Sequence, residues 1–363
     1  MGHNLKLPKR NSLLVLAKVI VMCLLLALIA RQVHWRDYQV AGSDGVATVS
    51  PGLISCIGGF RLLPFMVGAA LQLLTIYLTA FRWRLLMLVQ GIVLDRRSVL
   101  RLSYLGEFFN NFLPGAMGGD AVKAYYVIKH TGKKGATIVS IFANRFVGLL
   151  VMVVISVMML GSWILIGSVG VSSLKQPVFS IFFVAIAIAV VLVVAFNRSL
   201  NNSSMFQRLI AKLPFSRQLE VLREAMHRHR KLGKMVWPIL LYSVLIVVSF
   251  ILSVMFVGIS LGVNLAWQQY FLYMPLIMIM TAVPITPGGV GVMEELFLYF
   301  FSSAGDPQKI LALALLYRLT LIICGLPGVA IFLASEKIAP GQITEELYEL
   351  KLESSRANQP DEI

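Results

Sequence analysis

The sequence has few charged residues. Only 13% of its 363 residues are Asp, Glu, Lys or Arg, whereas 58% are hydrophobic. Soluble proteins expose much more charge, and stretches close to the ~20 apolar residues that span a bilayer occur several times in this chain. An ordinary soluble protein is therefore excluded, and we predict an all-α polytopic membrane protein, because helices satisfy their own backbone in lipid.

Cysteine and histidine are also scarce. Cys23, Cys56 and Cys324 lie far apart, without the Cys-x-x-Cys or Cys/His spacing of zinc or redox sites. His227 and His229 are two residues apart, so a helix would place their rings on different faces. We expect no metal site and no cofactor.

Catalytic signatures are missing as well. The sequence contains no GxSxG, Walker or HExxH motif and no nucleophile beside a base, so we expect no catalytic residues and no enzyme. An integral membrane transferase is the weakest of three alternatives for that reason. The net charge of +15 suits cytoplasmic loops facing anionic lipid, so nucleic acid is not the expected partner.

Six stretches are apolar and long enough to span a membrane. The first follows three basic residues, as a signal peptide would, but no small-residue cleavage site with a soluble domain comes after it, so we expect a retained helix. The predicted spans are 13–31, 62–81, 136–162, 178–196, 236–262 and 309–334.

The basic residues orient these spans, because Lys and Arg gather on the cytoplasmic side. Residues 197–234 carry nine Lys or Arg against two Glu, and residues 32–60 form the main outer loop. We predict a bacterial inner-membrane protein with both termini in the cytoplasm, ending in an acidic tail at 336–363. The other basic residues predicted to be cytoplasmic are Lys6, Lys9 and Arg10 before the first span, Arg82, Arg84, Arg96, Arg97 and Arg101 after the second, and Lys123, Lys129, Lys133 and Lys134 around the end of the segment 102–129.

Two apolar segments, at about 102–129 and 270–305, are broken by proline and glycine near the middle. Broken backbone at membrane depth is tolerated only where protein or water satisfies it, so we predict two re-entrant helical hairpins within a single domain, residues 1–335. The residues of the breaks are Pro114, Gly115, Gly118 and Gly119 in the first, and Pro287, Gly288, Gly289 and Gly291 in the second.

The two segments align without a gap at an offset of 173. Residues 114–145 and 287–318 then share Pro114/Pro287, Gly115/Gly288, Gly118/Gly291, Tyr126/Tyr299, Gly132/Gly305 and Arg145/Arg318. Three predicted spans separate the hairpins, so one enters from the cytoplasm and the other from outside. We therefore expect an arrangement resembling an inverted repeat, as in many transporters.

Arg145 and Arg318 lie inside predicted spans, the first about 13 Å along its helix at 1.5 Å per residue. A buried Arg needs protein, water or an anion beside it. One interpretation is a grip on lipid phosphate. The other is an ion pair with Asp120, Glu294 or Glu295, and the sequence leaves both open.

Asp120, Glu294 and Glu295 directly follow the breaks. They either neutralise a helix N-terminus or bind an ammonium or sugar headgroup, and one of the Glu pair is a candidate proton carrier. Glu107 and the pair Asn110–Asn111 either satisfy free backbone groups of the hairpin or contact a headgroup. For Lys123 we favour an interaction with the cytoplasmic interface over phosphate binding.

These motifs resemble those of a known family. The chain resembles the flippase-like family named for the transmembrane region of lysylphosphatidylglycerol synthase, a family that includes the flippase part of the multiple peptide resistance factor. The resemblance is carried by the stretches GEFFNNFLPGAMGGDAVKAYYV, ANRFVGLL and AVPITPGGVGVMEE, with the later LLYRL. The resemblance covers roughly residues 13–335, and we expect a stand-alone member without the synthase domain.

The resemblance implies movement of a phospholipid or lipid-linked headgroup between leaflets, with membrane lipids, anionic ones in particular, as partners. It implies that Asn111, Asp120, Arg145, Glu294, Glu295 and Arg318 serve substrate binding or translocation. The alternative is a membrane partner that moves no lipid and presents it to a separate transferase through the basic 197–234 loop. The sequence does not indicate an oligomeric state.

Overall fold

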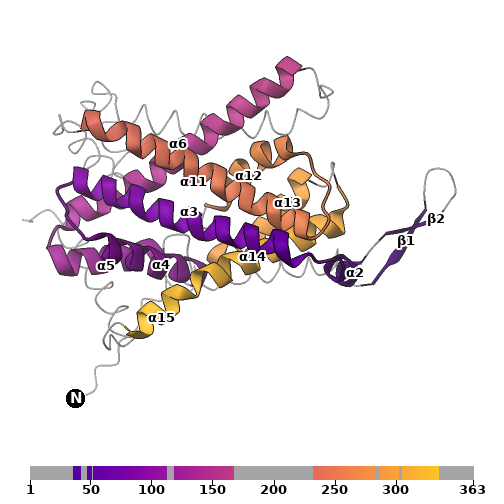
Figure 1. Cartoon of the computed structure of the whole chain (residues 1–363), viewed down its shortest axis with the longest axis horizontal. Helices are drawn as coiled ribbons and strands as arrows, with labels where there is room; N and C mark the ends of the chain where they lie inside the picture. The colour runs from indigo at the N-terminus through magenta and orange to yellow at the C-terminus, as the bar shows by residue number, and fades with distance from the viewer. Residues whose placement is uncertain are drawn as a thin grey trace, which may run out of the picture.

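The chain is helical in the computed structural model (Figure 1). The structure describes residues 36–41, 47–50, 52–112, 118–166, 232–282, 286–301 and 305–334. The helices are α2 (Leu53–Gly58), α3 (Leu62–Val89), α4 (Arg96–Phe112), α5 (Gly118–Thr131), α6 (Lys134–Ile166), α11 (Leu232–Ser260), α12 (Trp267–Thr281), the 3-10 turn η1 (Pro287–Gly289), α13 (Val292–Phe301), α14 (Pro307–Gly325) and α15 (Pro327–Ala334).

Four helical stretches among the described residues are long and apolar enough to cross a membrane. They coincide with four of the predicted spans and confirm a helical membrane protein. These stretches are Leu62–Val89, Lys134–Leu165, Met235–Ser260 and Pro307–Leu333. The predicted spans 13–31 and 178–196, the basic loop as far as residue 231 and the tail 336–363 lie outside the described residues.

A short β-ribbon occupies the predicted outer loop. Strand β1 (Tyr38–Ala41) pairs antiparallel with β2 (Ala47–Ser50). The Gly52 amide donates to the Asp37 carboxylate at 2.7 Å, which ties the two ends of the ribbon together. We did not predict these strands, because four-residue strands carry too little alternation to stand out from a loop.

Helix α3 runs two turns further than predicted and ends at Val89. Gly91 has a φ of +71°, its amide donates to Leu88, and the Ile92 amide donates back to Met87. This left-handed glycine cap also packs Ile92 against Met87 in a buried cluster. Our placement of Arg82 in a cytoplasmic loop was therefore wrong.

Arg82 lies inside α3 and is only 4% exposed. Its guanidinium donates to the Asn144 side chain and carbonyl, both at 2.9 Å, and to the Ser243 hydroxyl at 3.1 Å. Neutral oxygens of α6 and α11 thus satisfy this cation, and Arg82 joins three helices. The predicted span 62–81 ended too early because ~20 apolar residues already suffice to cross the bilayer.

Helices α3 and α11 pack closely along their length. Gly68 of α3 leaves room for Ser253, whose hydroxyl donates to the Gly68 carbonyl at 2.8 Å, and a Cβ added at Gly68 would lie 3.0 Å from the Ser253 carbonyl. Small residues at such contacts let membrane helices approach and bond. This pair forms the scaffold on which the two broken segments are held.

The two broken segments lie at opposite ends of α3, and the helix ends remote from each break, called outer ends here, point away from each other (Figure 1). The outer ends of α4 and α5 lie by the end of α3, where Lys133 donates to the Gly91 carbonyl at 2.7 Å. The outer end of α12 lies by the start of α3, because the Arg61 amide donates to Ser260 and Tyr270 packs at Gly258. This is the arrangement expected of two opposed hairpins, and their re-entrance into the membrane stays a prediction.

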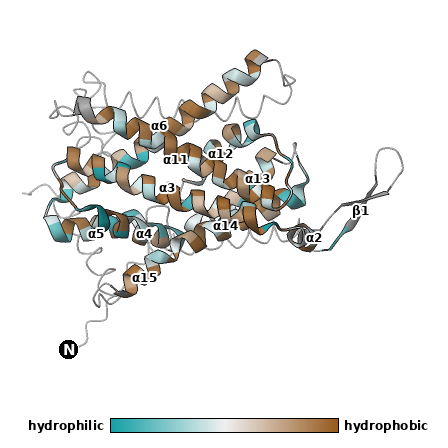
Figure 2. Cartoon of the chain, viewed as in Figure 1, coloured by the Kyte–Doolittle hydropathy of each residue, from teal (hydrophilic) through white to brown (hydrophobic). Residues whose placement is uncertain are grey.

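The hydropathy pattern separates the two kinds of element. Figure 2 shows hydrophilic residues gathered on α4 and α5, whereas α11 and α14 are mainly hydrophobic. The largest buried cluster joins α11, α12, α13 and α14, and includes Ile251, Met274, Phe297 and Leu313. The polar residues of α4 and α5 thus lie outside this largest apolar cluster.

Candidate functional site

The first broken segment is a tightly packed pair of antiparallel helices, α4 and α5. Gly119 lies directly against Gly106, and a side chain at Gly119 would overlap the Gly106 carbonyl. The Gly119 amide donates to the Asn110 side chain at 2.9 Å, so Asn110 satisfies a free amide at the start of α5. The two helices predicted within 102–129 are present, and the residues between them, 113–117, lie outside the described residues.

The predicted break residues of this segment have different roles. Gly118 and Gly119 form the first turn of α5, and Gly119 serves close packing, not reversal of the chain. Pro114 and Gly115 lie outside the described residues.

The second break is made by glycine conformations that other residues rarely adopt. Gly288, Gly289 and Gly291 have φ values of +60°, +66° and +84°, in the left-handed region. They join α12 to α13 through the short turn at Pro287–Gly289. The predicted reversal of the chain here follows directly from this run of glycines.

Arg318 fastens the second break. It donates to both carboxylate oxygens of Glu294, and also to the carbonyls of Gly288 at 3.2 Å and Gly289 at 3.0 Å. Glu294, which is 1% exposed, additionally accepts the Gly291 amide at 2.8 Å. The neighbouring Glu295 is half-buried and forms no ion pair within the described part of the chain.

Arg145 makes the corresponding contact in the first half. It forms an ion pair with Asp120, in the first turn of α5, and Lys123 lies 3.5 Å from the same carboxylate. In both halves an Arg of the following long helix therefore holds the acid next to its own break. Of the two interpretations that the sequence left open, the ion pair is the one present.

The tips of the two broken segments meet. A Cβ added at Gly288 would lie 3.0 Å from the Asn111 carbonyl, so the backbone at the end of α4 is adjacent to the second break. The Asn111 side chain donates to the Leu321 carbonyl of α14 at 3.4 Å. Asn111 thus lies at the junction between the halves, and its role in substrate binding stays a prediction.

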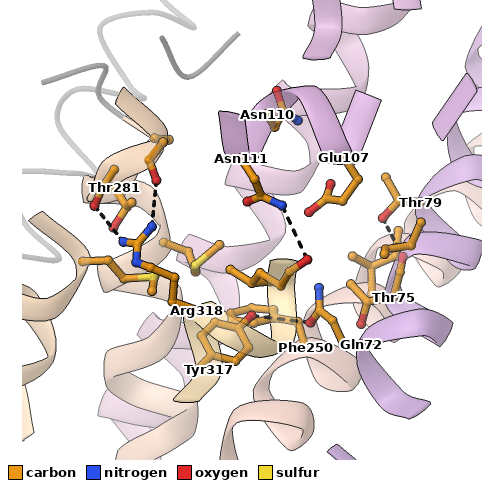
Figure 3. Close-up of a pocket in the computed structure, with 18 of the residues that line it drawn as sticks. Gln72, Thr75, Thr79, Glu107, Asn110, Asn111, Phe250, Thr281, Tyr317 and Arg318 are labelled. Carbon is orange, nitrogen blue, oxygen red and sulfur yellow. Dashed lines mark hydrogen bonds between the residues drawn. The ribbon is translucent and has the colours of Figure 1, made fainter. Parts of the chain in front are cut away.

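A cavity of about 310 Å³ lies where the tips meet (Figure 3). This volume is at the lower end of the roughly 300–1,000 Å³ typical of small-molecule sites. Both arms of the first segment, the break of the second segment, and helices α3, α6, α11 and α14 contribute to its wall. The charged residues lining it are Glu107, Lys123, Arg145 and Arg318.

Helix α3 presents a row of polar residues to this cavity. Gln72, Thr75 and Thr79 share one face of the helix, at spacings of three and four residues. The hydroxyls of Thr75 and Thr79 donate to carbonyls of their own helix at 2.9 and 2.8 Å, and Gln72 accepts from Tyr317 at 3.5 Å. We did not predict this row, although its helical spacing within an apolar run was a usable signal.

Lys123 also differs from expectation. We favoured a position at the membrane interface, but Lys123 is 8% exposed, lines the cavity, and has its ammonium 5.6 Å from the centre of the Trp83 ring. The adjacent Asp120 and the aromatic face stabilise its charge inside the fold. Its side chain faces inward because Gly106 leaves space for it.

Fold and site together define a polytopic helical membrane protein with two opposed broken segments around a charged cavity. Residues 15–328 match the family described as the lysylphosphatidylglycerol synthase TM region, and the chain belongs to this family. The resemblance drawn from the sequence motifs is thereby confirmed.

Two archaeal relatives extend the comparison. A UPF0104 membrane protein of Pyrococcus horikoshii, PH1989, is 23% identical over 258 residues, covering 66% of this chain and 77% of the relative. A UPF0104 membrane protein of Methanothermobacter thermautotrophicus is 22% identical over 272 residues, covering 69% and 78%. Their names state a membrane protein and no activity.

Proposed function

We propose that the protein moves a phospholipid, or the headgroup of a lipid-linked compound, between the two leaflets of its membrane. Family membership makes it a membrane protein related to lipid metabolism. The observation that carries the proposal is the charged cavity at the meeting point of two opposed broken segments. A headgroup would occupy the cavity while its acyl chains stay in lipid.

The depth of the cavity supports this function. Gln72 and Thr79 lie about 15 and 26 Å along the roughly 42 Å of α3, at 1.5 Å per residue, so the polar row is near the middle of a spanning helix. Moving a charged headgroup through hydrocarbon is very costly, and polar groups at this depth lower that barrier. They have no comparable value for a protein that only anchors others.

Orientation is part of the proposal. From the basic segments we propose that both termini lie in the cytoplasm of a bacterial inner membrane and that the first hairpin returns to that side. A cysteine replacing Lys129 is then labelled by a membrane-impermeant maleimide from the cytoplasmic side. Labelling from the outer side alone would contradict the orientation.

Removal of the α3 polar row tests transport. The double substitution Thr75→Val with Thr79→Val keeps side-chain volume and deletes two hydroxyls from the cavity wall. In the double variant the passing headgroup loses two hydrogen bonds to these hydroxyls. At ~1 kcal/mol each, their loss predicts a roughly tenfold or greater fall in the rate of lipid exchange. The measurement is dithionite quenching of tail-labelled fluorescent lipid in vesicles that contain the purified protein.

Thr131→Val is the matched control, because Thr131 ends α5 and does not line the cavity. It should exchange lipid at the wild-type rate. Wild-type vesicles that quench no more than protein-free vesicles would exclude transport. Such a result, combined with retained lipid binding, would favour the alternative protein that presents lipid to a transferase.

A further inference from the structure

The charges around the cavity are not all compensated within the fold. Arg318 is fully engaged, since Glu294 and two backbone carbonyls accept its hydrogen bonds. It is therefore a structural residue of the second break and has little capacity left for a ligand. The other charged residues that line the cavity are Glu107, Lys123 and Arg145.

Glu107 is the one acid among the described residues that line the cavity. Its carboxylate forms no hydrogen bond and no ion pair with any described residue. In Figure 3 the side chain points into the cavity, between Asn111 of its own helix and Thr79 of α3. An unpaired carboxylate among apolar helices is costly, so this position calls for water or a cationic partner.

Positive charge lies close by. Lys123 and Arg145 both contact the carboxylate of Asp120. Lys123 packs against Gly106, the residue next to Glu107. The ammonium of Lys123 can accommodate a further acceptor, because it offers three donors and Asp120, at 3.5 Å, is its one ion-pair partner among the described residues.

We infer that the cavity recognises a zwitterionic headgroup, in which an ammonium contacts Glu107 and a phosphodiester contacts Lys123. The inference rests on the proposed function and specifies its substrate class. An ammonium with unused donors beside a carboxylate that accepts no hydrogen bond from the described residues is complementary to such a headgroup, and each contact is a charge-assisted hydrogen bond. A purely anionic headgroup would leave Glu107 unpaired, and a phosphate beside it would be repelled.

Calorimetric titration of the full-length purified protein in neutral detergent tests this inference. The probes are glycerophosphoethanolamine, its N-acetyl derivative and glycerophosphoglycerol, which share the phosphodiester but differ in the ammonium. We expect the zwitterionic probe to bind about tenfold more tightly than either of the others, as one charge-assisted hydrogen bond allows. Glu107→Gln should abolish that preference.

Asp95→Asn is the matched control, because it removes an exposed acid directly before α4, the helix that carries Glu107, and does not line the cavity. It should keep the preference. Equal binding of the three probes by the wild type, or a preference that survives Glu107→Gln, would overturn the inference. If the variant does not fold, the comparison of the N-acetyl probe with glycerophosphoethanolamine on the wild-type protein still tests whether the ammonium is recognised. A retained preference without leaflet exchange of any lipid would instead contradict the proposed transport and support the binding site.

Discussion

Replacing Glu294 by Gln should lower the free energy of unfolding by roughly 3–5 kcal/mol, the usual cost of breaking a buried ion pair. The variant leaves the Arg318 guanidinium without its counter-ion at a site where the Glu294 side chain is 2% exposed. It also weakens the acceptor for the Gly291 amide. Denaturant unfolding in detergent, followed by circular dichroism, measures the loss.

Two further variants define the cause. Glu295→Gln changes the adjacent acid, which forms no ion pair with the described residues, and should be nearly neutral. Adding Arg318→Met to Glu294→Gln removes the uncompensated charge and should restore part of the stability. Recovery stays incomplete because the carbonyls of Gly288 and Gly289 lose their donor. Equal stability of Glu294→Gln and Glu295→Gln would show that the pair does not hold the break.

Gly119→Ala should destabilise the first segment by at least ~1–3 kcal/mol, the cost of overpacking. The new methyl group would overlap the Gly106 carbonyl, which is backbone and cannot rotate away. Helices α4 and α5 must then separate, and the hydrogen bond from the amide of residue 119 to the Asn110 side chain is lost. We expect both thermal stability in detergent and lipid exchange to fall.

Gly135→Ala is the matched control. It makes the same chemical change near the start of α6, where an added Cβ meets nothing within 4 Å. Alanine favours helix over glycine by roughly 1 kcal/mol, so this variant should be as stable as the wild type or slightly more stable. A Gly119→Ala protein that behaves like Gly135→Ala would refute the close contact between the arms.

The sequence was sufficient for the general architecture. Runs of apolar residues predicted four spans that the structure confirms, and proline with glycine predicted where the helices break. These features depend on local composition, which is visible in any window of the sequence. The motif resemblance likewise identified the family before the fold was known.

Contacts between distant segments could not be predicted in the same way. The pairing of Arg145 with Asp120 and of Arg318 with Glu294 was one of several open alternatives, because sequence separation alone does not select a partner. Arg82 was misplaced because its acceptors, Asn144 and Ser243, are supplied by helices far along the chain. The fold decides whether such a charge is buried or exposed.

Cavity residues were missed for a related reason. Glu107 and Lys123 were considered, but their roles depend on which neighbours are already engaged, and this requires the geometry of both segments. The row at Gln72, Thr75 and Thr79 consists of single polar residues in an apolar run, each unremarkable alone. Their common orientation toward the cavity is what identifies them as part of its wall.

The central claim is that a lipid headgroup enters the cavity while its tails remain in the bilayer. Photo-crosslinking with two phosphatidylethanolamine probes, one with a diazirine in the headgroup and one with a diazirine in an acyl tail, followed by peptide mass spectrometry, tests this most directly. The account predicts headgroup adducts on cavity-lining residues such as Thr79 and Met278, and tail adducts on exposed residues such as Leu73 and Tyr77. Headgroup adducts confined to Leu73, Tyr77 and the other exposed residues would contradict it.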